Sequence, residues 1–506
     1  MSLPRVSVIV LNWNGRYLLP PTLQALLRTD YPNFEAVVVD NGSTDGSPEL
    51  VRREFPQVRV IETGCNLGFA GGNNVGIGAT LGEYVVLLNS DTQVTPGWLT
   101  PLVDAAEADP RVAACCPKLL YLYDRLDLQL TSETFVPARA GAGTDGRTLG
   151  VQLYAATVDS PYGPQLADPL DGFFPPEGPP GRRFRWTEAQ AGLRIPVPSP
   201  SGTVVRLRLA APRPDGRPVR VTLYAGDETV AELSVGPRVQ EYTLRLPEAV
   251  AAQARPYIQH AGHLLLPELA ARDRGTIVRN GIALSEPDVG QYDCCEEVFS
   301  ACGAALLLRR AALLQVGLLD ERMFMYYEDV DLCWRLRMHG WKVLYVPQSV
   351  VRHLHCGSSG EWSPLFVYNV ERSRLLMLLK NAPASLAARE WGTYLLSTAL
   401  GWGRAVRALV QRAPHACEVL ARAWLQTRVN ASVLAALPGL LAERQIQQRT
   451  RCLPDRDILR WVTSPSSSVE QVGHAPSPIA PAGTRVEALF PSPMQQERGP
   501  GGEGPR

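Results

Sequence analysis

Three features are missing from this sequence, and each absence narrows the classes of protein to which it can belong. No apolar stretch reaches the roughly 18 residues that a membrane-spanning helix needs, so we expect no transmembrane segment. Lysine plus arginine and aspartate plus glutamate both number 50, so the chain has no overall charge to attract nucleic acid, and we expect none as a partner. The ten cysteines contain no CxxC spacing, which argues against a zinc site. Because Val6–Leu11 also lacks the length and cleavage site of a secretory signal, we expect a reduced, cytoplasmic protein.

Strand and helix signals alternate along the first part of the chain. Apolar runs predict buried strands at 6–11, 34–39, 58–61 and 84–88, and helical spacing predicts helices at 17–28, 47–55, 72–80 and 96–109. Such alternation predicts an α/β fold in which a doubly wound, mostly parallel sheet is covered by helices on both faces.

The texture of the sequence changes after this α/β part. Short alternating strands separated by Pro/Gly turns predict an all-β sandwich or jelly roll over 137–256, and α/β signals resume after it. We therefore interpret residues 1–136 and 257–371 as one split domain with a β-domain inserted. An amphipathic helical region, 372–462, and a polar tail, 463–506, for which we expect disorder, complete the chain.

Polar side chains follow three of the predicted strands. Asn12 follows the first, Asp40 and Asn41 follow the second, and Asn89 with Asp91 follow the fourth. Since ligands of doubly wound sheets bind at the carboxyl ends of the strands, these residues together indicate a site, although each segment alone would serve as a βα turn. Asn and Asp suit the polar edges of a base or ribose, and Asp91 is placed to hold a divalent cation.

A glycine-rich loop, 66–74, precedes one predicted helix and contains Gly68 and Asn73. Its glycines allow a close approach of backbone amides to an anion. It matches neither GxGxxG nor GxxxxGK[ST], so we disfavour a dinucleotide-binding fold and a P-loop.

The second half of the chain holds a dense acidic run and several histidines. Glu328, Asp329 and Asp331 stand in the first turn of a predicted helix, where the helix dipole favours their charged form and where acids are common for structural reasons alone. His353 and His355 could be metal ligands or surface residues of a strand. The remaining histidines we interpret as ordinary surface or packing residues, including His260, His263 and His339.

In this order and spacing, the segments resemble family 2 glycosyltransferases, and among them the bacterial rhamnosyltransferase-like branch. The resemblance rests on 6–15, 40–46, 66–74, 87–92, 303–310 and 326–335 with His353, and covers roughly residues 1–130 and 257–380. It implies a GT-A fold and inverting transfer of a sugar from a nucleotide-diphosphate sugar to a hydroxyl of a glycan or lipid-linked acceptor.

The resemblance also implies residue roles on the donor side. Asp40 would bind the base with Asn12 and Asn41 nearby, and we place Gly68 and Asn73 with them. Residues 89–91 occupy the family's DxD position, where Asn89 replaces the first acid, so Asp91 would be the principal carboxylate ligand. His353 would be the other ligand of a Mg²⁺ or Mn²⁺ ion, and His355 is the weaker candidate.

On the acceptor side, the resemblance implies that Asp329 is the general base. Glu328 and Asp331 would shape the acceptor pocket and the helix start. Gly303 and Ala304 would line the sugar and acceptor site.

Several alternatives stay open at this point. The chain could be a non-catalytic glycan-binding or scaffolding protein on a degenerate transferase fold, or, more weakly, a nucleotidyltransferase. The helices of 372–462 could lie on a membrane surface at the inner face of the membrane, or pack against the rest of the chain or a partner. Aromatic residues of the β-domain could form a sugar-stacking platform or, as we prefer, its core: Phe173, Phe174, Phe184 and Trp186.

Overall fold

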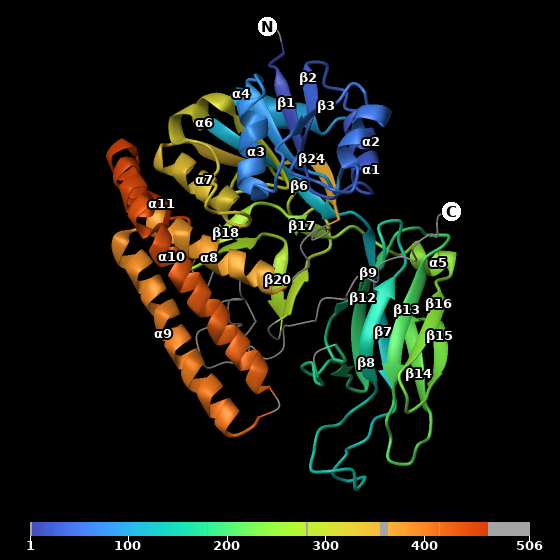
Figure 1. Cartoon of the computed structure of the whole chain (residues 1–506). Helices are drawn as coiled ribbons and strands as arrows, with labels where there is room; N and C mark the ends of the chain where they lie inside the picture. The colour runs from blue at the N-terminus through green and yellow to red at the C-terminus, as the bar shows by residue number, and fades with distance from the viewer. Residues whose placement is uncertain (1–2, 180, 280–281, 355–362, 414, 464–506) are drawn as a thin grey trace, which may run out of the picture. The chain divides into compact units, whose positions relative to one another are not determined.

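Most of the runs predicted as buried strands join one mixed sheet in the computed structural model, which describes residues 3–179, 181–279, 282–354, 363–413 and 415–463 (Figure 1). The chain divides into two compact units. We call the one made of residues up to 125, 255–358 and 367 onward the α/β unit, and the other, mainly residues 126–254, the β unit. His355 and nearly all of the predicted tail lie outside the described residues.

The sheet of the α/β unit is parallel in its first half and mixed in its second. Its order is β22-β24-β6-β23-β4-β1-β2-β3, with β17 paired to β6 and β5 paired to β24. The bounds are β1 Val6–Asn12, β2 Phe34–Asp40, β3 Arg59–Glu62, β4 Tyr84–Asn89, β5 Thr92–Val94, β6 Val112–Tyr121, β17 Ile258–His260, β22 Glu296–Glu297, β23 Ala305–Arg309 and β24 Lys342–His353. Strand β23 runs antiparallel to both β4 and β6. It does not follow a helical crossover, so it is not constrained to be parallel.

Helices cover both faces of this sheet, which confirms the doubly wound prediction. They are α1 Leu19–Leu26, α2 Ser47–Glu54, α3 Gly68–Gly78, α4 Leu99–Ala108, α6 Arg310–Val316 and α7 Glu328–Met338. Val8 and Val10 of β1 pack in the core under α1, α2 and α4, whereas Ile9 packs in the core under α3, α6 and α7. The alternation follows from the two-residue period of a strand. Helix α3 begins at Gly68 rather than at residue 72, so the glycine-rich loop is itself helical.

The C-terminal helices extend the α/β unit. They are α8 Pro364–Asn381, α9 Ala384–Val410, α10 Ala416–Thr450 and α11 Asp455–Leu459. Helices α9 and α10 form a long hairpin (Figure 1), and their residues Tyr394 and Val433 share a buried core with Trp334 of α7 and Leu376 of α8. No helix among the described residues is both long and apolar enough to cross a bilayer.

The β unit contains two antiparallel sheets around its own core, ordered β10-β12-β7-β14-β15 and β11-β8-β13-β16 with β9 on β8. The strands are β7 Asp124–Ser132, β8 Gln152–Val158, β9 Gln165–Leu166, β10 Asp168–Pro169, β11 Arg185–Trp186, β12 Gln190–Val197, β13 Val204–Ala210, β14 Val219–Ala225, β15 Glu228–Val235 and β16 Gln240–Arg245, followed by α5 Glu248–Ala251. Leu126, Leu128 and Leu130 of β7 face this core, so the unit begins before residue 137, where we place the boundary from sequence. Trp186 is buried and makes edge-to-face contacts with Phe135 and Phe184, as in a core rather than an exposed platform.

The chain leaves the α/β unit after Arg125 and returns to it at Arg255, and these two residues are paired. Arg125 and Arg255 pair as an antiparallel bridge, with each amide donating to the other residue's carbonyl at 2.8 and 3.1 Å. Two small hairpins follow this junction, β18 His263–Leu265 with β19 Ala271–Asp273, and β20 Thr276–Arg279 with β21 Ile282–Ser285.

Candidate functional site

The ends of β1 and β2 bring together the first two predicted polar residues. The parallel register places Asn12 beside Asp40. Asn12 Nδ2 donates to Asp40 Oδ1 at 3.0 Å and to Ser43 Oγ at 3.1 Å, and the Ser43 amide donates to Asp40 Oδ2 at 3.0 Å. Both side chains are buried, yet Asn12 Oδ1 has no hydrogen-bond partner among the described residues. A buried acceptor without a partner is costly in the free protein and is suited to an incoming donor group.

Asn41 and Gly68 hold the start of α3 in place. Asn41 Nδ2 donates to the Gly68 carbonyl at 3.0 Å, and Asn41 Oδ1 accepts from the Leu67 amide at 2.9 Å. Gly68 has φ +74°, and a Cβ there would lie 2.3 Å from the carbonyl oxygen of Phe324. The absence of a side chain therefore lets the chain before α7 approach α3.

Asn73 makes its contact inside the helix, where Nδ2 donates to the Phe69 carbonyl at 2.9 Å. For Asn41, Gly68 and Asn73 the structure thus shows framework contacts, and their roles in donor binding stay predictions.

Asp91, Asn89 and His353 meet although Asn89 and His353 are 264 positions apart. The pairing of β24 with β5 sets His353 opposite Thr92, next to Asp91. Asp91 Oδ1 lies 3.0 Å from His353 Nε2, and Asn89 Nδ2 lies 3.3 Å from the same nitrogen. Gln259 Oε1 lies 2.8 Å from His353 Nδ1. Since a carbonyl oxygen only accepts, Nδ1 carries a proton toward Gln259, and Nε2 is the ring nitrogen that faces Asp91.

Asp329 lies at the start of α7, on a backbone with two left-handed residues. Tyr326 and Tyr327, which precede the helix, have φ +68° and +67°, a conformation that non-glycine residues rarely adopt and that gathers at functional sites. The Gly303 amide donates to Asp329 Oδ2 at 2.8 Å, and the Ala304 carbonyl accepts from the Asn89 amide at 2.9 Å. Two adjacent residues thus connect Asp329 with the segment that carries Asp91.

Glu328 and Asp329 are neighbours in different surroundings. Glu328 is buried, and its Oε2 has no hydrogen-bond partner among the described residues. Burial, and secondarily the charge of Asp329, raises the pKa of Glu328 well above its ordinary value. Asp329 is partly exposed and accepts an amide hydrogen bond, which stabilises a carboxylate. The surroundings of these two adjacent carboxyl groups therefore differ, and burial opposes the charged form of Glu328.

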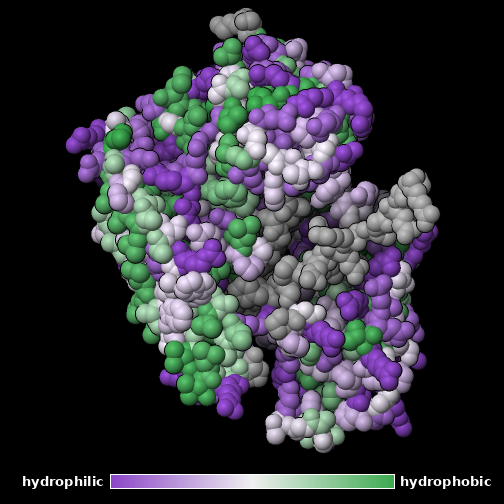
Figure 2. Space-filling model, viewed as in Figure 1, coloured by the Kyte–Doolittle hydropathy of each residue, from purple (hydrophilic) through white to green (hydrophobic). Residues whose placement is uncertain are grey.

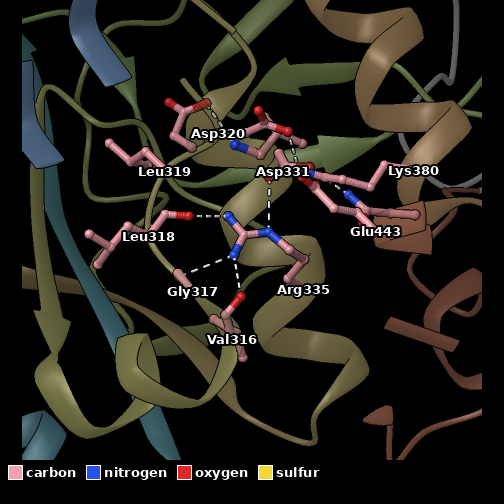
Figure 3. Close-up of polar contacts among 12 residues, drawn as sticks. Val316, Gly317, Leu318, Leu319, Asp320, Asp331, Arg335, Lys380 and Glu443 are labelled. Atoms are coloured by element: carbon pink, nitrogen blue, oxygen red, sulfur yellow. Dashed lines mark hydrogen bonds and ion pairs between the residues drawn. The ribbon is translucent and has the colours of Figure 1, made fainter. Parts of the chain in front are cut away.

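Asp331 belongs to a network of hydrogen bonds and ion pairs with Arg335 and Lys380 (Figure 3). It is fully buried, and its carboxylate accepts from Arg335 Nε at 3.0 Å, Lys380 Nζ at 2.8 Å and Asn381 Nδ2 at 2.7 Å. Arg335 also donates to the carbonyls of residues 316–318, and Lys380 to Asp320 at 2.6 Å. These contacts fasten α7 to α8, and the predicted part of Asp331 in the acceptor pocket stays a prediction.

Two family models match this chain, one over the first part of the α/β unit and the start of the β unit, the other after the β unit. "Glycosyl transferase family 2" matches residues 7–154, and "Glycosyltransferase like family 2" matches residues 288–374. An N-acetylglucosaminyl-diphospho-decaprenol L-rhamnosyltransferase of Mycobacterium tuberculosis is 24% identical over 349 residues, which cover 66% of this chain and 70% of the relative. The chain is a glycosyltransferase with two segments that match family 2, and it is similar to this rhamnosyltransferase. Its mixed sheet with C-terminal helices has the GT-A type of architecture that the resemblance implies.

Other relatives of this glycosyltransferase match shorter stretches. The succinoglycan biosynthesis protein ExoO of Rhizobium meliloti is 34% identical over 108 residues, which cover 21% of this chain and 31% of that protein. Among solved structures, a crystal structure of GalNAc-T7 with UDP, GalNAc and Mn²⁺ aligns over a longer part, 79% of this chain and 51% of that chain, at 12% identity and with a TM-score of 0.41.

Two residues around the site of this glycosyltransferase make contacts that the sequence did not predict. Gln259, which orients His353, carries no signal in the sequence. His260 is buried, in agreement with the packing alternative for this residue, but its hydrogen bond with the segment that carries Gly303 was not predicted. Both residues belong to β17, a short strand whose pairing with β6 no local pattern indicates.

Proposed function

We propose that this glycosyltransferase moves a sugar from a nucleotide diphosphate to an acceptor hydroxyl with inversion, and that Asp329 is the general base. The observation that carries the proposal is the arrangement around residues 303–304. The Gly303 amide donates to Asp329, and the Ala304 carbonyl accepts from the backbone amide of Asn89, two residues before Asp91. Residues 303–304 are thus hydrogen-bonded both to Asp329 and to the strand end that carries Asp91, the partner of His353.

In the proposed reaction the acceptor hydroxyl attacks the anomeric carbon in a single displacement. The Asp329 carboxylate takes the proton of that hydroxyl, the new C–O bond forms, and the bond to the diphosphate oxygen breaks with its electron pair going to the diphosphate. A single displacement inverts the anomeric centre and needs no covalent intermediate. Glu328 is buried, whereas Asp329 is partly exposed and accepts from the Gly303 amide, so Asp329 is the carboxyl of the pair that an acceptor hydroxyl can approach.

Asp91 and His353 would hold a divalent cation, Mg²⁺ or Mn²⁺. The donor set fits, because a carboxylate oxygen and an imidazole nitrogen lie 3.0 Å apart, and Gln259 accepts from the other ring nitrogen. Asn89 contributes no carboxylate, so Asp91 is the sole acid of residues 89–91. When bound, a divalent cation offsets the negative charge that develops on the leaving diphosphate.

Asn12 and Asp40 would recognise the base or ribose of the donor. The unpartnered Oδ1 of Asn12 is a buried acceptor that suits an N–H or O–H group of the nucleoside. The neighbouring Asp40 is buried and oriented by Asn12 and Ser43, which keeps its carboxylate in one position.

The acceptor would be the hydroxyl of a glycan or of a lipid-linked sugar, and the α9–α10 hairpin would rest on the surface of a membrane that carries such a lipid. The hairpin exposes large apolar side chains: Leu395, Leu396, Leu400, Val406, Leu409, Val410, Trp424 and Leu434. Figure 2 shows apolar residues gathered over these helices. Between residues 391 and 441 the sequence has five arginines and a single acidic residue, Glu418. An apolar face combined with arginines is typical of helices that lie on anionic lipid.

The experiment that tests the proposed base compares Asp329→Asn with Asp104→Asn, an exposed aspartate on α4. We expect Asp329→Asn to lower kcat by roughly 10²–10⁴-fold, the usual contribution of a general base. The asparagine Oδ1 can still accept from Gly303, so donor binding in calorimetry should stay close to that of the unchanged protein. Asp104→Asn should keep its turnover. Near-native turnover of Asp329→Asn would refute the assignment.

A further inference from the structure

Two histidines and an aspartate form a cluster beside the base-bearing helix, outside the residues assigned so far. His260 ends β17, His263 begins β18 and Asp273 ends β19. Asp273 Oδ1 lies 2.6 Å from His260 Nδ1 and 3.3 Å from His263 Nε2, and the two imidazole rings meet edge to face at 4.6 Å. His260 is 1% exposed, whereas the Asp273 side chain is 47% exposed.

The cluster has the composition of a metal site, but the hydrogen bonds of His260 argue against one. Ligand atoms of its three side chains lie within 4.8 Å of one another. However, the Cys302 amide donates to His260 Nε2 at 3.0 Å, so this nitrogen carries a lone pair. The proton of the neutral ring is then on Nδ1 and points at Asp273. A histidine that binds a metal through Nδ1 would instead donate from Nε2.

The two histidines of the cluster make their other hydrogen bonds with Ser300 and Cys302, in the segment that leads to Gly303. His263 Nδ1 lies 3.0 Å from Ser300 Oγ, within hydrogen-bond distance, and the His263 amide donates to the Ser300 carbonyl at 2.8 Å. His260 accepts from the Cys302 amide, and the next amide in the chain, that of Gly303, donates to Asp329 at 2.8 Å. The position of the Gly303 amide therefore depends on the anchor one residue before it.

We propose that His260, oriented by Asp273, is a positioning residue that holds the Cys302 amide so that the Gly303 amide stays bonded to Asp329. The role rests on the proposed function of Asp329 as the base. Burial lowers the pKa of His260, which keeps the ring neutral and Nε2 free to accept. Burial opposes the charged form of His263, but its hydrogen bond with Asp273 prevails and raises the pKa of His263.

The same short strand then serves both halves of the site. Gln259 of β17 fixes the ring of His353 on the cation side, and His260 fixes Cys302 on the base side. Successive residues of a strand point to opposite sides, which allows one strand to do both.

Two substitutions at His260 separate its contacts. The amide of Gln reaches the position of Nε2, so His260→Gln retains an acceptor for the Cys302 amide. The shorter His260→Asn retains a donor toward Asp273 and loses that acceptor. We expect His260→Asn to lower kcat by about 10-fold or more, corresponding to about 1.4 kcal/mol, while donor binding is unchanged and His260→Gln stays within about 3-fold of the unchanged protein.

The pH profile of kcat gives a readout that a merely structural role would not change. An amide hydrogen bond favours the ionised form of a carboxylate, so its weakening in His260→Asn should move the acidic limb of the profile to higher pH. The other titratable groups with which Asp329 interacts are Glu328 and the Cys333 thiol on its own helix, Tyr327 just before that helix, His260 and His263 from the hairpin side, and the Cys302 thiol. All but His260 are identical in the two variants, so a difference between the profiles reports on the acceptor.

Asp273→Ala is a second variant for the case in which His260→Asn does not fold, because the Asp273 side chain is half exposed and its loss should be tolerated. It removes the group that holds the His260 proton on Nδ1, and we expect the same direction of change. Unaltered kcat and pH limb in both folded variants would overturn the positioning role. Stoichiometric metal in the purified protein that is lost in His263→Ala would also overturn it, in favour of a metal site. If Asp329→Asn is inactive and the His260 variants behave like the unchanged protein, this inference fails alone; if Asp329→Asn is active, the proposed base fails.

Discussion

At the scale of single residues, surroundings separate the chemistry of side chains that are alike in sequence. Glu328 and Asp329 are adjacent acids, but one is buried without a hydrogen-bond partner for its Oε2 among the described residues, and the other accepts an amide hydrogen bond near solvent. Burial costs the charged form of a carboxyl most where no donor compensates it. Burial therefore opposes ionisation of Glu328, whereas Asp329 has a backbone donor and access to solvent.

This division predicts how Glu328 affects stability as the pH changes. Because burial raises the pKa of Glu328, its favourable contribution is fully present below the ordinary glutamate pKa of about 4.3, and is lost as the pH rises through its raised value in the folded protein. Glutamine cannot ionise, so Glu328→Gln should match the unchanged protein at about pH 4 and become the more stable of the two toward neutral pH. Thermal unfolding across this range measures the difference. The exposed Glu49→Gln should show no such divergence, and a constant difference for Glu328→Gln would contradict the neutral state.

Asp91 should couple nucleotide binding to the cation. A nucleoside diphosphate with Mn²⁺ is expected to raise the Tm of the unchanged protein, since a ligand that binds only the folded state stabilises it. In Asp91→Asn the increase that depends on the cation should largely vanish, because a carboxylate is replaced by a neutral amide. Asp104→Asn is the matched control. A cation-dependent increase of unchanged size in Asp91→Asn would remove this residue from the cation site.

At the scale of elements, helix α7, which carries Asp329, is joined to α8 by buried ion pairs. Asp331, Arg335 and Lys380 tie α7 to α8 through buried, mutually satisfied charges (Figure 3). Arg322 extends the network by pairing with Asp320 and with Glu443 of α10. Buried ion pairs are stabilising only when their hydrogen bonds are complete, and removal of one partner is expected to loosen the start of α7.

The exposed face of the α9–α10 hairpin leads to a prediction about lipid. The unchanged protein should float with vesicles that contain anionic lipid and much less with neutral vesicles, and salt should weaken the interaction. Leu396→Glu and Val410→Glu, at side chains that are 60% and 79% exposed, should reduce flotation without unfolding the hairpin. Leu314→Glu, at an 81% exposed leucine of α6, should leave it unchanged. Equal flotation of all three variants would argue against this face as the contact.

At the scale of the whole molecule, the β unit has its own core, and both of its ends meet at Arg125 and Arg255. Residues that exchange two backbone hydrogen bonds in an antiparallel pair have Cα atoms about 5.5 Å apart, so a short linker can join them. The division of the chain into domains remains our proposal, and this junction is the place to test it.

We predict that replacing residues 126–254 by two or three glycine or serine residues leaves a folded protein that still binds nucleoside diphosphate. The expected result is a cooperative thermal transition and a Tm increase with nucleotide and Mn²⁺. The fragment 126–254 should also fold by itself. An insoluble or non-cooperative shortened protein would show that the α/β unit depends on the β unit.

Local patterns were sufficient for much of this protein. Apolar runs predict the strands from β1 to β4, and the polar residues after them lie where predicted because each follows directly from the end of its own strand. Asn12 and Asp40 meet for that reason. The first turn of α7 is likewise visible from its acids.

The remaining features depend on partners far away in the sequence, which only the tertiary structure could decide. Gln259 and His260 make their contacts through the pairing of β17 with β6, Asp331 makes its contacts with Lys380 and Asn381 of α8, and the pKa of Glu328 is raised mainly by burial. A residue's type determines which contacts it can make, and its position in the sequence determines those made to near neighbours. Contacts across the sheet depend on strand pairing, and that pairing distinguishes an ordinary buried histidine from one that holds the amide beside the proposed base.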